Sequence, residues 1–214
     1  MSDFTLKPCS TVITGMTGTG KTTLAFLHLL KTPCACRFIF DDMGQAAARL
    51  KLPHVSTPKQ LEASLQTRWS CFNPHPMFRG DVNAAHEFWC KWVFETSRRT
   101  RHKKIAFTDE AWRFQDRENI SQEMSVLSQM GRSENIEQLT TTLEPHRMNS
   151  ALLGSATELI CFRLQDSIDL KKIQGLGADA DAVSRLPLGS FISYNRVNPT
   201  RPDGTKNIYR GKLF

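Results

Sequence analysis

The chain has 214 residues and a formal net charge of +7 at neutral pH. Its 40% of hydrophobic and 23% of charged residues are typical of a globular protein long enough to bury a sizeable core. No apolar run approaches the roughly 18 residues of a membrane helix, and the first ten residues lack the basic and then apolar pattern of a signal peptide, so we expect a cytoplasmic protein. The positive charge fits a polyanionic partner such as nucleic acid, although basic proteins without one are common.

Six cysteines are scattered along the sequence, at positions 9, 34, 36, 71, 90 and 161. The tripeptide CAC at 34–36 lacks the spacing of a zinc site, and no pair of histidines supports one. We therefore expect buried free thiols rather than metal ligands or disulfides.

The first half of the chain alternates short apolar runs with helical patterns. Residues 10–14 predict a first strand that ends at a glycine-rich loop, and the helix expected at 22–31 has leucines 24, 27 and 30 at helical spacing. A second strand at 37–42 ends on two acids. A helix at 58–67 and a strand at 68–74 follow. This alternation predicts a parallel sheet covered by helices.

The second half continues the same pattern. Residues 83–99 predict an amphipathic helix whose aromatic stripe we assign to the core rather than to base stacking; its shared face consists of Ala85, Phe88, Trp89, Trp92, Val93 and Thr96. A buried strand at 104–112, a helix at 120–130 stopped by Gly131, strands at 136–142 and 158–164 and a short helical region near 167–185 come next. Residues 189–196 and 207–214 predict a closing antiparallel pair around a turn region at 199–204.

The glycine-rich loop reads GMTGTGKT at 15–22 and matches G-x-x-x-x-G-K-[ST] between a predicted strand and a predicted helix. Its backbone N–H groups and the start of the helix favour an anion, Lys21 would reach the β- and γ-phosphates, and the Thr22 hydroxyl would ligate Mg²⁺. This predicts a nucleotide site rather than a turn with an incidental lysine. The predicted nucleotide-binding residues are Gly15, Met16, Thr17, Gly18, Thr19, Gly20, Lys21, Thr22 and Thr23.

A second motif, KIAFTDEAW, ends a buried strand on two acids. Asp109 would hold Mg²⁺ through water, and Glu110 would orient and deprotonate a water in line with the γ-phosphate. The plainer alternative is a pair of surface acids. A kinase of small molecules must exclude water, and no arginine-rich lid segment is visible, so the acid pair favours ATP hydrolysis.

Over about residues 10–196, the chain resembles the FtsK–HerA superfamily of DNA-pumping ATPases. The segments that carry the resemblance are, in order, GMTGTGKTT, FIFDDMGQ, CFNP, FTDEAWRF, GRSENIEQLTTTLEPHR and ATELICFRLQD. The compact length is most similar to genome-packaging ATPases of tailless, membrane-containing (tectivirus-like) viruses. The resemblance implies a single RecA-like (ASCE) P-loop NTPase domain over 1–214, with a mostly parallel central sheet flanked by helices, a C-terminal antiparallel strand pair and a tail at 197–214.

The resemblance also implies roles for individual residues. Lys21 and Thr22 match the first nucleotide motif, and Asp109 and Glu110 match the second. Arg132 matches an arginine finger that reaches the ATP of a neighbouring subunit, with a helix-capping arginine as the alternative; Arg147 and Arg163 are further candidates. The sequence departs from the family at Leu143, where a polar γ-phosphate sensor is expected, and a leucine side chain cannot donate a hydrogen bond. Thr141, Thr142 or Glu144 with Arg147 are possible substitutes.

DNA in the channel of a ring would be contacted through its phosphates. The densest basic run, at 97–104, supplies Arg98, Arg99, Arg101, Lys103 and Lys104, although a solvated helix end is the favoured explanation for it. A second set of candidates comprises Arg79, Arg201, Lys206, Arg210 and Lys212. Residues 75–81 are expected to form a surface loop that projects Phe78 and Arg79.

The function expected from these residues and this resemblance is an ATP- and Mg²⁺-dependent motor that packages viral double-stranded DNA. It would act as a homo-oligomeric ring in the host cytoplasm or the virion, at a packaging vertex, with capsid or portal-vertex proteins as further partners. Filamentous-phage assembly ATPases, which usually carry a membrane segment, and longer conjugation or partition motors are alternatives. A small-molecule kinase and a nucleotide-gated docking protein with little turnover are alternatives from other classes.

Overall fold

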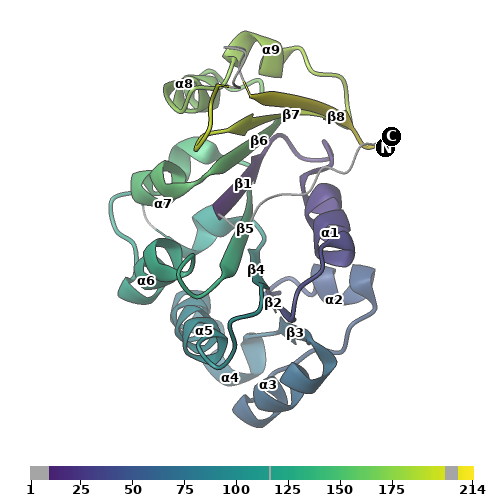
Figure 1. Cartoon of the computed structure of the whole chain (residues 1–214), viewed down its shortest axis with the longest axis vertical. Coiled ribbons are helices and arrows are strands. Elements are labelled where there is room, and N and C mark those ends of the chain that lie inside the picture. The colour runs from purple at the N-terminus through teal and green to yellow at the C-terminus, as the bar shows by residue number, and fades with distance from the viewer. Residues whose placement is uncertain (1–9, 116, 201–206) are drawn as a thin grey trace.

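An eight-stranded sheet organises the chain, in the order β3-β2-β4-β5-β1-β6-β7-β8 (Figure 1). The computed structural model describes residues 10–115, 117–200 and 207–214. Strands β1 to β6 run parallel, and β7 and β8 are antiparallel additions at one edge. This confirms the expected α/β fold class. The strands are β1 (Ser10–Thr14), β2 (Cys36–Phe40), β3 (Trp69–Phe72), β4 (Lys104–Thr108), β5 (Ile136–Thr142), β6 (Glu158–Phe162), β7 (Ser190–Asn195) and β8 (Ile208–Lys212).

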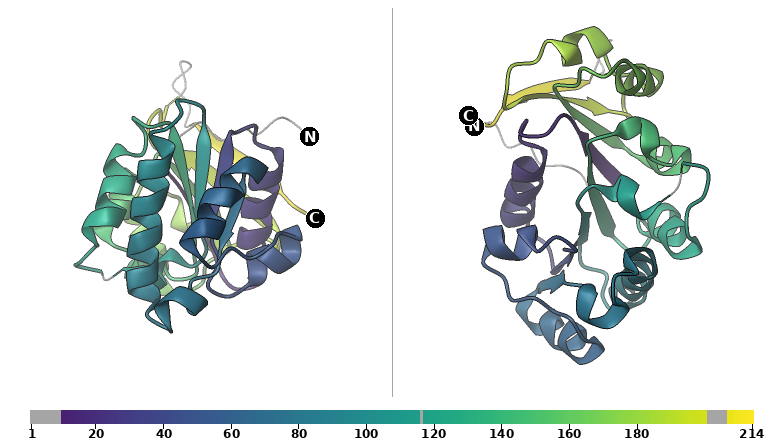
Figure 2. Two further views of the ribbon diagram at one scale, coloured as in Figure 1. Left: turned by 90° about the horizontal axis from the view of Figure 1, so that it is seen from below. Right: turned by 180° about the vertical axis from the view of Figure 1, so that it is seen from behind.

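Helices cover both faces of the sheet (Figure 2). One face carries α1 (Lys21–Lys31) and α2 (Gln45–Leu50), and the other carries α5 (Val82–Ser97), α6 (Gln122–Met130) and α7 (Ser150–Ser155). The remaining helices are α3 (Pro58–Ser64), α4 (His75–Phe78), α8 (Ser167–Gly175) and α9 (Ala180–Ser184), and short 3-10 turns lie at η1 (Leu65–Thr67), η2 (Ala111–Phe114) and η3 (Pro145–Arg147).

Alternation along the strands divides the core into two layers. Within β4, Ile105 and Phe107 belong to the cluster that packs with α1 and α2, whereas Ala106 belongs to the cluster beneath α5 and α6. Every residue of β4 is buried, as expected for a central strand covered on both faces. The sheet therefore holds the carboxyl ends of β1, β4, β5 and β6 at one fixed edge.

Helix α5 buries the face that the sequence predicts. Ala85, Trp89, Val93 and Thr96 are buried, and Phe88 packs against the same core. Trp92 also packs there, edge-on to Phe38 at 5.3 Å between ring centroids. The aromatic stripe is thus part of the core.

Helix α1 buries a different face from the one its leucines suggest. Leu27 and Leu30 are 37% and 57% exposed, whereas Ala25, Phe26 and Leu29 are buried. The buried face also includes polar His28, which pairs with buried Glu137 at 2.7 Å. The helix expected at 22–31 is confirmed, and of its three spaced leucines Leu24 packs half-buried against the core.

Three short helices, α2, α4 and α7, are absent from the sequence-based prediction. Helix α4 replaces the loop expected at 75–81, and Phe78 packs on Phe72 and Phe88 instead of projecting outward. Arg79 is exposed, as expected. The turn region expected at 199–204 falls mainly outside the described residues, while the antiparallel pairing of β7 with β8 is confirmed.

The five cysteines among the described residues are free thiols, and four of them are buried; Cys34 is half-buried, and Cys9 lies outside the described residues. Across 10–115, 117–200 and 207–214, the search for a helix with the length and apolar character to cross a membrane finds none.

A histidine lies in the core beside the sheet. His86 of α5 is 1% exposed, stacks on Phe114 at 4.8 Å between ring centroids, and lies 3.4 Å from the hydroxyl of Thr108. Burial lowers the pKa of His86 from 6.5 to about 3. The imidazole is therefore neutral in the fold over the physiological range.

This burial predicts acid sensitivity. Below pH 6.5 the unfolded chain takes up a proton at His86, while the folded chain does so only near pH 3, so acidification favours unfolding. We expect wild type to lose up to about 1.4 kcal/mol of unfolding free energy per pH unit relative to His86→Phe in this window. Urea unfolding of both proteins between neutral pH and about pH 4 measures the difference. Parallel pH profiles would contradict the assignment.

Candidate functional site

The candidate site lies at the carboxyl edge of the parallel strands. The loop after β1 leads into α1, and the acids follow β4. Strand β5 separates β1 from β4 and pairs with both. Parallel sheets bind ligands at this edge, so the topology brings the two sequence motifs together where a nucleotide is expected.

The loop at 15–20 is shaped by glycines. Gly18 and Gly20 have φ angles of +75° and +111°, which favour glycine. A Cβ at Gly15 would lie 2.5 Å from Cβ of Phe162, and one at Gly20 would lie 2.7 Å from the Leu213 side chain. The loop is therefore packed between β6 and the segment after β8.

Hydrogen bonds fix the same loop. The Met16 N–H donates to the Arg163 carbonyl at 2.9 Å, and the Thr19 hydroxyl donates to the Met16 carbonyl at 2.7 Å. Helix α1 begins after Gly20 without a side-chain cap, so its first N–H groups remain available to an anion.

Lys21 is enclosed by the loop that it follows. Its side chain is 6% exposed, and Nζ donates to the Met16 carbonyl at 3.2 Å and lies 3.8 Å from Oε1 of Glu110. Burial lowers the pKa of Lys21, and the carboxylates of Glu110 and Asp109 act in the opposite direction. A bound polyphosphate would add negative charge and favour the protonated form further.

Thr22 and Asp109 meet across the sheet. The Thr22 hydroxyl donates to Oδ1 of Asp109 at 3.3 Å, and the Thr141 hydroxyl of β5 donates to the same oxygen. Thr141 also accepts the Glu110 N–H at 3.0 Å. The hydroxyl and the carboxylate that converge here are the hard oxygen donors that Mg²⁺ prefers, so the residues fit this ion.

Glu110 follows Asp109 and has a φ angle of +48°, in the left-handed region that residues other than glycine rarely adopt. Its Oε2 accepts the Leu143 backbone N–H at 2.7 Å and the Trp112 indole N–H at 3.0 Å. The Leu143 position thus contacts the acid through its backbone, although its side chain offers no donor.

The other proposed sensor substitutes take different roles. Thr141 contacts both acids, whereas the buried Thr142 hydroxyl has no hydrogen-bond partner within the described residues. Glu144 pairs with Arg147 at 3.2 Å, as the sequence suggested they could. The contact of Trp112 with Glu110 was missed, although an indole donor two residues after the acid was visible in the motif.

A pocket adjoins the acids between the ends of β2 and β4. It is lined in part by Asp42, Asp109, Glu110 and Arg113. Arg113 pairs with Asp42 at 2.8 Å; burial raises the pKa of Asp42, and Arg113 opposes this effect. This pair, which the sequence did not suggest, ties the segment after the acids to the end of β2.

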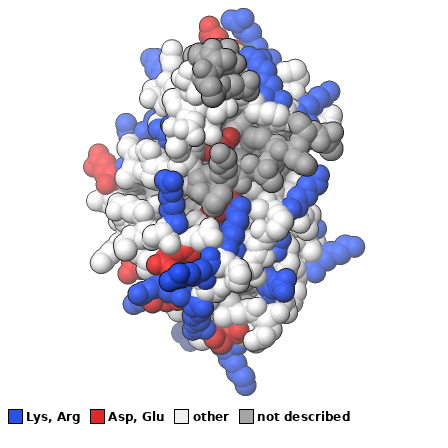
Figure 3. Space-filling model, in the orientation of Figure 1, with Lys and Arg blue, Asp and Glu red and all other residues white. Residues whose placement is uncertain are grey.

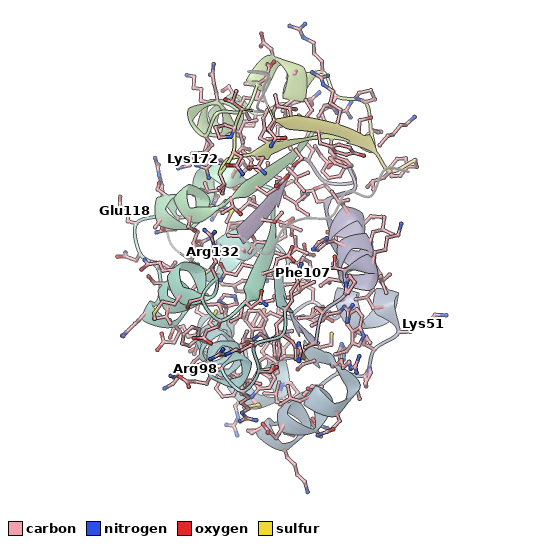
Figure 4. All side chains as sticks on the ribbon, viewed as in Figure 1. Lys51, Arg98, Phe107, Glu118, Arg132 and Lys172 are labelled. Carbon is pink, nitrogen blue, oxygen red and sulfur yellow. The ribbon has the colours of Figure 1, made fainter. Side chains whose placement is uncertain are left out.

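The three candidate arginines lie in different places. Arg132 is exposed in the turn between α6 and β5, at the opposite edge of the sheet from the phosphate loop (Figure 4). A five-residue strand spans about 16 Å, more than an arginine side chain can bridge, so Arg132 cannot reach a phosphate in its own loop. Arg147 and Arg163 lie at the carboxyl edge, and Nε of Arg163 is buried with no hydrogen-bond partner among the described residues.

Much of the basic run at 97–104 is engaged within the protein. Lys104 is 1% exposed and donates to the carbonyls of Ser97, the last residue of α5, and of Thr100 beyond it. It is therefore excluded as a DNA contact. Lys103 pairs with buried Glu137 at 2.7 Å.

The arginines of the run are exposed. Arg98 and Arg99 pair with Glu95 and Glu62, and Arg101 has no acidic partner within the described residues. Of the second set, Arg210 and Lys212 are also exposed, and Arg201 and Lys206 fall outside the described residues. Basic side chains on the face in Figure 3 are spread among acidic and uncharged ones.

Comparisons with known proteins identify the fold. No protein-family model matches the sequence, and neither does any curated protein. Among solved structures, the genome packaging NTPase B204 from Sulfolobus turreted icosahedral virus 2, in complex with AMPPCP, is similar at a TM-score of 0.73 and 15% identity, over 98% of this chain and 100% of that one.

Two further structures extend this result. A crystal structure of B204, the DNA-packaging ATPase from Sulfolobus Turreted Icosahedral Virus, is also similar. Its TM-score is 0.66 at 16% identity, over 97% of this chain and 98% of that one. VirB4 of Thermoanaerobacter pseudethanolicus is similar at a TM-score of 0.67 and 12% identity, over 96% of this chain and 89% of that one. At these identities the likeness establishes the fold, and it confirms at that level the resemblance drawn from the motifs.

The close packing of the phosphate loop yields a direct test. Gly15→Ala should lower the unfolding free energy by about 1–3 kcal/mol and weaken ATP binding, because the new methyl group meets Phe162. Gly154→Ala in α7 is the matched control, since nothing lies within 4 Å of its added Cβ. Thermal unfolding and ATP titration of both variants measure the effect. Equal behaviour of the two variants would contradict the packing argument.

Proposed function

We propose that this chain is an ATP-hydrolysing motor that translocates double-stranded DNA and packages a viral genome into a preformed capsid. The observation that carries the proposal is the convergence of Lys21 and Thr22 with Asp109 and Glu110 at one sheet edge. These four residue types in this arrangement suit cleavage of a nucleoside triphosphate by water.

Each group would take one part of the reaction. The loop N–H groups and Lys21 would hold the phosphates, and Thr22 and Asp109 would hold Mg²⁺, which when bound neutralises charge on the β- and γ-phosphate oxygens. Glu110 would orient a water and accept its proton. The Thr141 hydroxyl would hold the two acids in a fixed relative position, because it contacts the Asp109 carboxylate and the Glu110 backbone N–H.

The choice of DNA as the substrate rests on fold likeness and charge. The B204 structures belong to a protein described as a genome packaging NTPase, and the similarity spans nearly the whole of both chains. The net charge of +7 suits a polyanion. The position of Arg132 supports assembly in a ring, because from the far edge it could serve only the nucleotide of a neighbouring subunit.

The first test is ATP hydrolysis by the purified protein with and without double-stranded DNA. We expect DNA to stimulate hydrolysis, with a steeper than linear dependence on protein concentration. Glu110→Gln should still bind ATP while hydrolysis falls by a factor on the order of 10² or more, the usual scale for a general base. Lys21→Ala should abolish ATP binding itself.

The alternatives predict different results. Activity that appears only with a small-molecule acceptor would identify a kinase. Tight ATP binding with turnover unaffected by Glu110→Gln would indicate a docking protein rather than a motor.

Arg132 has its own test. In mixtures of wild type and Arg132→Ala, we expect mutant subunits to inhibit wild-type neighbours, since each finger would act on the adjacent site and removing one typically costs on the order of 10³-fold in rate. Activity should then fall more steeply than the wild-type fraction. Arg185→Ala is the control, since Arg185 is an exposed arginine after α9 that belongs to none of the candidate sites. A loss proportional to the mutant fraction would argue against action between subunits.

A further inference from the structure

The carboxylate of Glu110 is held by one of its two oxygens. Oε2 accepts both the Leu143 N–H and the Trp112 indole N–H, at 2.7 and 3.0 Å. Oε1 makes neither contact and lies 3.8 Å from Nζ of Lys21, at the phosphate loop. The two donors therefore direct the remaining oxygen toward the site of the reaction.

Trp112 is itself fixed from the other side. It lies in η2, half-buried against the core, and the guanidinium of Arg147 stacks 4.0 Å from its ring centroid. Arg147 pairs with Glu144, the residue after Leu143. These contacts connect the end of β5 with the segment after β4.

We infer that Trp112 is a positioning residue for Glu110, and that its indole N–H and the Leu143 backbone N–H together restrain the carboxylate. The inference rests on the proposed hydrolysis of ATP and gives a role to a residue at the end of the second motif to which the sequence assigned none. A left-handed backbone at Glu110 does not by itself select a side-chain orientation, so two directional donors are needed to restrict the carboxylate.

The test separates the indole N–H from the aromatic ring. Trp112→Phe keeps a ring beneath Arg147 but removes the donor, and we expect kcat for ATP hydrolysis to fall about 10- to 100-fold with little change in KM or in ATP affinity. Trp112→His retains a ring N–H and should recover part of the loss. Trp92→Phe is the matched control: Trp92 is also half-buried but belongs to α5 and packs against Phe38, so its substitution should leave kcat unchanged.

A double-mutant cycle identifies the partner. If Trp112 acts through Glu110, adding Trp112→Phe to Glu110→Gln should lower hydrolysis much less than it does in wild type. Equal loss in both backgrounds, a loss of ATP affinity instead of kcat, or a wild-type rate in Trp112→Phe would each overturn the inference.

The outcomes also distinguish this inference from the proposed function. If Glu110→Gln loses hydrolysis and Trp112→Phe does not, the positioning role fails while the ATPase assignment stands. If wild type binds ATP without hydrolysing it, the proposed function fails and the positioning role with it.

Discussion

The bond from the Thr22 hydroxyl to Asp109 is the contact on which the rest of the site depends, because it joins two motifs that lie 87 positions apart in the sequence. One residue lies in the first turn of α1 and the other follows β4, and β5 runs between β1, which leads into α1, and β4. Thr141 of β5 fills the gap by contacting both acids. A site of this kind requires that three parallel strands end level with one another.

The sheet meets this requirement through its register and burial. In the pairing of β1 with β5, Thr14 lies opposite Thr142, and in that of β4 with β5, Thr108 lies opposite Thr140. A one-residue slip would turn Ile105 and Phe107 away from α1 and bring Ala106 toward it, so the two core layers hold the register. The precision of the polar edge thus derives from apolar packing on both faces.

Much of this arrangement can be predicted from the sequence. The strand bounds at 10–14 and 136–142, the antiparallel end and the inward face of α5 follow from periodicity, and the two nucleotide motifs follow from their flanking elements. What could not be predicted depends on contacts between distant segments. The buried contact of His28 in α1 with Glu137 in β5 joins residues 109 positions apart, and the internal use of Lys104 is invisible in a run of charges. Trp112 could be noticed in its motif, but its orientation toward Glu110 requires the end of β5.

The packing of Leu213 against Gly20 has a consequence for how the protein matures. The phosphate loop is among the first described segments to leave the ribosome, whereas the residue that closes one side of it follows β8, the last strand. Contacts between such distant segments form late, since their loop-closure entropy must be overcome first. A nascent chain would therefore carry the complete phosphate-binding sequence long before Leu213 could pack against it, so the loop would reach its final packing only when the last described strand is in place.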